Sequence, residues 1–159
     1  MISNKIIYIH GLQSNSQSKK AKKFASLFPE IEIPDFTGSF QERMDYLYPI
    51  LGNEKDWTII GSSFGGLMGS VFTCKHPEQV RKLVLLAPAL ILPEFALQHF
   101  APIDIPVVLV HGTNDELMPP MQVRELAAEV FENLEYIVIE DDHRLHKAIE
   151  ELDWREILA

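Results

Sequence analysis

The sequence has a single cysteine, Cys74, among its 159 residues. One thiol excludes an internal disulfide and a zinc site built on paired cysteines, and it fits a reducing compartment. Basic residues are also scarce, because 14 Lys and Arg stand against 23 Asp and Glu, for a formal net charge of −9. Phosphate groups bind clustered Lys and Arg, so this balance argues against nucleic acid or an anionic membrane as a partner.

Long apolar runs are absent as well. No stretch approaches the ~18 residues that would span a bilayer. Near the N-terminus the apolar run Ile6–Ile9 ends at once at His10-Gly11, unlike the core of a signal peptide, so we expect a cytoplasmic protein. The length suits one domain, and 47% hydrophobic with 23% charged residues is an ordinary globular composition. We therefore expect residues 1–159 to form a single domain.

Short, mostly apolar runs recur along the chain and alternate with helical patterns at 21–28, 64–76, 123–131 and 145–152. Apolar residues follow one another in these runs without alternation, which predicts strands buried on both faces, as in a parallel sheet. The pattern predicts a three-layer α/β fold: a mostly parallel sheet of about six strands with helices on both faces. The runs are Ile6–Ile9, Trp57–Ile60, Leu83–Leu86, Val107–Val110 and Tyr136–Ile139, with a weaker sixth at Glu30–Pro34.

The motif G-x-S-x-G directly follows the second of these runs and opens a helical pattern, with Ser63 at its centre. On a sharp strand-to-helix turn such a serine stands clear of the sheet, and Gly61 and Gly65 leave room for neighbouring backbone. The alternatives are a plain Gly/Ser turn or a phosphate-binding loop. However, a dinucleotide loop needs glycine where Ser63 stands, and a P-loop needs lysine where Leu67 stands. Ser63 is therefore the candidate nucleophile.

A serine nucleophile needs a base to take its proton and an acid to orient that base. In strand–turn–helix proteins with this motif, the chain order is serine, acid, histidine. Asp115 lies just past the fourth run and is the candidate acid, with Glu116 as its competitor. By itself, Asp115 could equally make a turn or cap the following helix. His143, in the loop after the fifth run, is the candidate base and is favoured over His146, which we expect within the last helix.

The negative charge of a tetrahedral intermediate needs two N–H donors. We expect one from the amide of Phe64 and the other from the amide of Leu12, in the loop after the first run. Gly11 allows this loop to turn inward, and His10 is expected to shape it by hydrogen bonding. A metal role for His10 is disfavoured because no second ligand stands at a suitable spacing near it. We expect no metal site and no cofactor.

These pieces, in this order and spacing, resemble the α/β-hydrolase family over essentially the whole chain. The opening Tyr8–Ser16 and the short length are similar to small single-domain bacterial esterases of the YqiA-like kind. The resemblance implies that Ser63 is the nucleophile, Asp115 the orienting acid and His143 the base. It also implies that the backbone N–H groups of Leu12 and Phe64 form the oxyanion hole. The segments that carry it are His10-Gly11-Leu12, Gly61–Gly65, His111–Asp115 and Asp142-His143.

Two features depart from the family pattern. The chain starts almost at the first strand, without the two antiparallel strands that precede it in many members. Only residues 88–105 stand where members often insert a helical lid, so we expect a minimal lid or none and an open site for small acyl groups. Apolar residues in that segment would line the acyl pocket or belong to the core, namely Leu90, Ile91, Leu92, Phe95 and Phe100.

The function expected from this pattern is hydrolysis of a carboxylic ester or thioester through an acyl-enzyme on Ser63. The expected partner is a small acyl substrate, and the sequence does not set the oligomeric state. Epoxide or halide-displacing hydrolysis is disfavoured, because related enzymes of those kinds have aspartate in place of this serine. Peptidase and cofactor-free peroxidase chemistry would use the same three residues. The alternative from another class is a non-catalytic binding protein with this fold.

Overall fold

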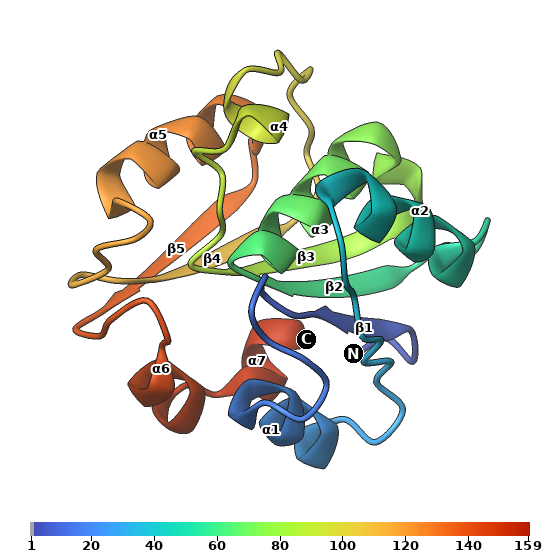
Figure 1. Ribbon diagram of the computed structural model, residues 1–159, viewed down its shortest axis with the longest axis horizontal. Helices are drawn as coiled ribbons and strands as arrows, with labels where there is room; N and C mark the ends of the chain where they lie inside the picture. The colour runs from blue at the N-terminus through green and yellow to red at the C-terminus, as the bar shows by residue number, and fades with distance from the viewer. Residues whose placement is uncertain (1) are drawn as a thin grey trace.

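The computed structural model describes residues 2–159. Its centre is a sheet of five parallel strands that lie side by side in chain order (Figure 1). The predicted α/β fold with a parallel sheet is therefore confirmed. The strands are β1 (Ile6–Ile9), β2 (Trp57–Ser62), β3 (Val80–Leu86), β4 (Val107–Gly112) and β5 (Leu134–Ile139).

Helices cover both faces of the sheet, which makes three layers (Figure 1). One face carries α1 (Lys19–Leu27), α6 (His146–Glu151) and α7 (Trp154–Leu158). The other carries α2 (Phe40–Leu51), α3 (Phe64–Lys75), α4 (Pro93–Ala96) and α5 (Pro120–Val130). A single turn of 3₁₀-helix, η1 (Pro77–Gln79), leads into β3. Among residues 2–159, no helix is long and apolar enough to cross a bilayer.

Successive side chains of a strand point to opposite faces, so each central strand contributes to two cores. In β1, Ile7 and Ile9 join the core beneath α2, α3 and α5, whereas Ile6 and Tyr8 join the core beneath α1, α6 and α7. All four side chains are at most 3% exposed. Burial on both faces explains why the strand runs in the sequence are continuously apolar.

The weak strand candidate Glu30–Pro34 does not form a strand. Only Glu32 pairs with β1: its N–H donates to the carbonyl of Ile6, and its own carbonyl accepts from the N–H of Tyr8, both at 2.9 Å. The next residue that would face β1 is Pro34, which has no N–H and cannot continue the ladder. The described residues therefore form a five-stranded sheet, close to the sheet of about six strands that the sequence predicted.

Two parts of the helical layer differ from the sequence prediction. The last helical pattern, 145–152, corresponds to α6, which ends where Leu152 leaves the helical conformation, and the further helix α7 that follows was not predicted. Helix α2 was not predicted, although its start carries a capping box: the Ser39 side chain accepts from the Glu42 N–H, and the Glu42 side chain accepts from the Ser39 N–H. The segment 88–105 contains one short helix, α4, which agrees with the minimal lid expected from the sequence.

Candidate active site

The predicted functional residues lie at one edge of the sheet, where the carboxyl ends of the parallel strands meet. His10 and Leu12 follow β1, Ser63 follows β2, and Asp115 and His143 follow β4 and β5. In parallel sheets this is the edge where ligands bind, because loops from several strands converge there. The shared direction of the parallel strands thus brings residues that are far apart in the sequence to one edge of the sheet.

Ser63 occupies the turn between β2 and α3 in a strained backbone conformation, with φ 52° and ψ −111°. Its N–H donates to the carbonyl of Leu86, and its carbonyl accepts from the N–H of Ala89, both at 2.9 Å. The two flanking glycines make the turn possible. A Cβ on Gly61 would collide with the carbonyl of Gly65, and one on Gly65 would collide with the carbonyl of Ile9.

The structure brings Ser63, His143 and Asp115 into one chain of hydrogen bonds. His143 Nδ1 lies 2.7 Å from Asp115 Oδ2, and His143 Nε2 lies 3.0 Å from Ser63 Oγ. Because a carboxylate only accepts, the Nδ1–H of His143 donates to Asp115, which leaves Nε2 free to accept the Ser63 hydroxyl proton. The competing candidates are not part of this chain of hydrogen bonds: Glu116 is exposed, and His146 is an exposed residue at the start of α6.

Asp115 is buried, and both of its carboxylate oxygens accept hydrogen bonds. Oδ1 accepts from the N–H groups of Leu117 and Met118 at 2.9 and 2.8 Å, while Oδ2 accepts from His143. Asp115 therefore makes the turn that the sequence allowed as its alternative role, and the same turn fixes the carboxylate against His143.

A second histidine, His111, also contacts this carboxylate, and its role was not recognised in the sequence. His111 Nε2 lies 3.1 Å from Asp115 Oδ2 and 2.9 Å from the carbonyl of Met118. Both partners only accept, so Nε2 carries a proton and donates to them. Burial lowers the pKa of His111 and favours the neutral ring. The signal in the sequence was its position four residues before Asp115, at the end of the strand that leads into the Asp115 loop.

His10 holds the loop after β1, as its sequence position suggested. It is fully buried; its Nε2 accepts from the N–H of Phe36 at 2.9 Å, and its Nδ1–H donates to the carbonyl of Gly11 at 2.7 Å. The Gly11 carbonyl also accepts from the N–H of Ser14 at 3.2 Å. This carbonyl belongs to the same peptide group as the Leu12 N–H, so the direction of that N–H is fixed.

The two predicted oxyanion donors flank Ser63. Phe64 is the next residue and begins α3, so its N–H has no partner within the helix. Gly11, which precedes Leu12, packs against Ser63: a Cβ built on Gly11 would lie 3.6 Å from the Ser63 Cβ. Within residues 2–159, neither the Leu12 nor the Phe64 N–H has a hydrogen-bond acceptor. Both amides are therefore available to a ligand.

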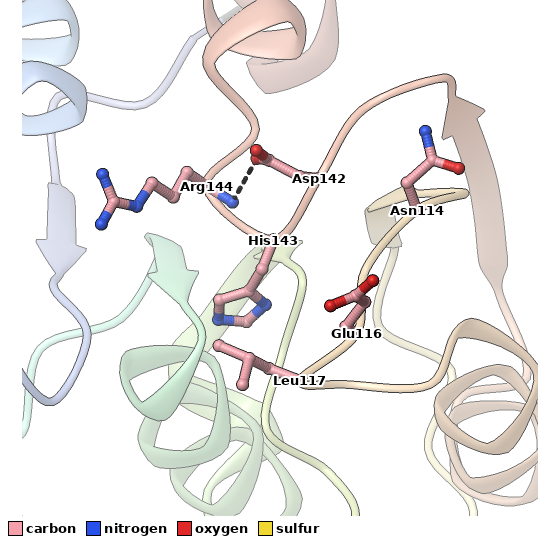
Figure 2. A pocket seen from close by; sticks show the side chains of 6 residues that line it. All are labelled: Asn114, Glu116, Leu117, Asp142, His143 and Arg144. Atoms are coloured by element: carbon pink, nitrogen blue, oxygen red, sulfur yellow. Dashed lines mark hydrogen bonds between the residues drawn. The ribbon is translucent and has the colours of Figure 1, made fainter.

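His143 also lines a cavity of about 400 Å³ between the loops that follow β4 and β5 (Figure 2). The residues that line it are of polar or charged type apart from Leu117, and Asp142 accepts a hydrogen bond from the backbone N–H of Arg144 at 2.9 Å. Of the apolar residues in segment 88–105, Leu90 and Phe95 are buried in the core and do not line this cavity. The remaining lining residues are Asn114 and Glu116.

A family model described as the alpha/beta hydrolase fold matches residues 11–104, more than half of the chain. The chain belongs to the α/β-hydrolase family. No curated protein matches this sequence. Membership of this family supports the interpretation of the protein as a hydrolase. In the described part of the chain, no group of three or more His, Cys, Asp or Glu side chains is placed to hold a metal ion.

Solved structures of other proteins share the fold of this chain at low sequence identity. Alpha/beta hydrolase domain-containing protein 10 from mouse is 22% identical with a TM-score of 0.71, over 91% of this chain and 84% of its own. An alpha-beta serine hydrolase homologue from Coxiella burnetii is 19% identical with a TM-score of 0.74, over 99% and 85%. Est1E from Butyrivibrio proteoclasticus, solved with bound ferulic acid, is 15% identical with a TM-score of 0.71, over 99% and 92%.

Proposed function

We propose that this α/β hydrolase cleaves a carboxylic ester or thioester through an acyl-enzyme on Ser63. The observation that carries the proposal is the unbroken hydrogen-bond chain from Ser63 through His143 to Asp115, at 3.0 and 2.7 Å. A serine in this arrangement is an activated nucleophile, because the base that accepts its proton is already in contact and correctly oriented. The partner is a small acyl substrate, and no cofactor or metal takes part.

In the acylation step, Ser63 Oγ attacks the carbonyl carbon of the substrate while its proton passes to His143 Nε2. The carbonyl oxygen becomes an oxyanion, which accepts hydrogen bonds from the N–H groups of Leu12 and Phe64. Asp115 stabilises the imidazolium that forms. When the tetrahedral intermediate collapses, the bond to the alcohol or thiol breaks and His143 Nε2 returns the proton to that leaving group.

Deacylation repeats these steps with water as the nucleophile. His143 Nε2 takes a proton from the water as its oxygen attacks the acyl carbonyl. The second tetrahedral intermediate then releases the carboxylic acid, and the proton on His143 returns to Ser63 Oγ. Over the full cycle one water is consumed, and the protein is restored to its starting state.

The leaving group must lie beside His143, because this residue delivers its proton. The cavity lined by His143 is therefore the site for the leaving group, and its walls of Asn114, Glu116, Asp142 and Arg144 suit a polar alcohol or thiol. The short segment between β3 and β4 leaves the site without a large cover. Both features favour small, water-soluble esters over long lipid chains.

The proposal is tested by hydrolysis of short p-nitrophenyl esters and acyl thioesters by purified variants. Ser63→Ala and His143→Ala should each lower kcat by about 10³-fold or more, because either change removes the whole proton-transfer unit. His146→Ala is the matched control and should keep the wild-type rate. If His146→Ala abolishes turnover while His143→Ala does not, the base is misassigned. If wild-type protein cleaves only peptide amides, or binds ligands without turnover, a peptidase or a binding protein takes the place of the esterase.

A further inference from the structure

A buried arginine, Arg43 of α2, contacts Leu12 and Phe64, the two predicted oxyanion donors. It is 4% exposed. Its Nη2 donates to the carbonyl of Leu12 at 3.2 Å, and its Nε donates to the carbonyl of Gly38 at 3.0 Å. The Cζ atom lies 5.3 Å from the centre of the Phe64 ring. One side chain thus touches both residues whose amides would bind the oxyanion.

The charge of Arg43 is not neutralised by a carboxylate. None of the ion pairs found in residues 2–159 includes it, and its Nη1 is buried without a hydrogen-bond partner. Burial lowers the pKa of this guanidinium, which nevertheless remains charged at neutral pH. A buried, unpaired charge costs folding free energy, so a purely structural role would be served better by an apolar side chain.

His10 and Arg43 each hold one of the two peptide groups that adjoin the Cα of Leu12. His10 fixes the peptide group that carries the Leu12 N–H, through the carbonyl of Gly11. Arg43 fixes the next peptide group, through the carbonyl of Leu12 itself. With both peptide planes held, the backbone of Leu12 has little freedom, although its side chain is 52% exposed. An exposed loop residue whose backbone is anchored twice by buried side chains is suited to hold one N–H in a fixed direction.

We infer that Arg43 is a positioning residue of the oxyanion hole. Its hydrogen bond to Leu12 and its contact with the Phe64 ring keep the two N–H donors in place before substrate binds. Its unpaired positive charge, itself buried, favours the negative charge that develops on the carbonyl oxygen. The inference rests on the proposed serine hydrolase activity, because it assigns Arg43 a part in that reaction only.

The test compares Arg43→Met, which keeps the stem and removes the guanidinium, with Arg43→Lys, which keeps the charge but not the fork of donors. Arg155→Met, an exposed position in α7, is the matched control. A fluorophosphonate counts the active sites in each preparation, and kcat and KM per labelled site are measured with p-nitrophenyl acetate. We expect kcat of Arg43→Met to fall by about 10- to 100-fold with KM within about threefold, because the lost contacts act on the transition state.

Arg43→Lys should lie between Arg43→Met and wild type, and Arg155→Met should match wild type. If Arg43→Met does not fold, the Lys variant decides by the same measure. Wild-type kcat per labelled site in the Arg43 variants, or a raised KM with unchanged kcat, would overturn the inference. Failure of the proposed function looks different, because wild-type protein would then neither label nor turn over at Ser63.

Discussion

At the scale of single residues, the carboxylate of Asp115 is held from more directions than its contact with His143 requires. Two backbone N–H groups bind one oxygen, and His111 shares the other oxygen with His143. A carboxylate fixed in this way keeps His143 in one tautomer and one orientation, with Nε2 directed at Ser63. His111 serves this purpose as a neutral donor, because burial lowers its pKa.

The state of His111 predicts how stability depends on pH. Because its folded-state pKa lies below the ordinary value of 6.5, the unfolded chain binds more protons on acidification. The contribution of neutral His111 to folding is therefore present above about pH 6.5 and is lost as the pH falls below that value. Thermal unfolding between pH 7.5 and 5 should show a Tm that declines with acidification, and His111→Gln should flatten this decline.

The control for this experiment is His146→Gln, which changes an exposed histidine at the start of α6. Its Tm should follow the wild-type curve at every pH. An acid slope for His111→Gln equal to that of wild type would contradict the assignment of His111 as a buried neutral ring.

The sequence could predict Ser63, Asp115 and His143, because a motif and a chain order single them out. It could not predict Arg43. In the sequence an arginine among Gln41, Glu42 and Asp45 suggests a solvent-facing position, whereas Arg43 falls on the buried face of α2. Its partner Leu12 is 31 positions away and is brought near only by the packing of α2 beside β1.

At the scale of elements, the turn between β2 and α3 depends on close backbone contact that no side chain can enter. We predict that Gly65→Ala lowers the free energy of unfolding by about 3 kcal/mol, because its Cβ would overlap the backbone carbonyl of Ile9. Gly11→Ala, in the facing loop, is the control. There a Cβ meets neighbours at an ordinary 3.6 Å, so the cost should stay below about 1 kcal/mol.

Urea unfolding of the two alanine variants measures this difference. Equal stabilities would mean that the backbone can shift to admit a side chain at position 65, which contradicts the close approach of Gly65 to the carbonyl of Ile9. The elements that the sequence did not predict correctly have local causes. The candidate Glu30–Pro34 has the composition of a strand, but the missing N–H of Pro34 ends its pairing with β1. Helix α2 was not predicted, although Ser39 and Glu42 form a capping box at its start.

At the scale of the whole molecule, the site is a consequence of the parallel direction of the strands. Parallel strands with helical crossovers put all carboxyl ends at one edge, so four loops meet there whatever their separation in sequence. Alternation of apolar runs with helical patterns was enough to predict this arrangement. The helices that cover each face, and the contacts between α2 and the loop after β1, depend on packing between distant segments and were not predictable from local patterns.

The central claim is that Ser63 is an activated nucleophile, and reaction with a fluorophosphonate tests it most directly. Such a probe forms a covalent bond only with a serine whose hydroxyl proton has a base to accept it. Wild-type protein should be labelled at one residue, Ser63 by peptide mapping, and folded Ser63→Ala should not be labelled. Folded wild-type protein that resists the probe, or labelling that persists in Ser63→Ala, would contradict the account.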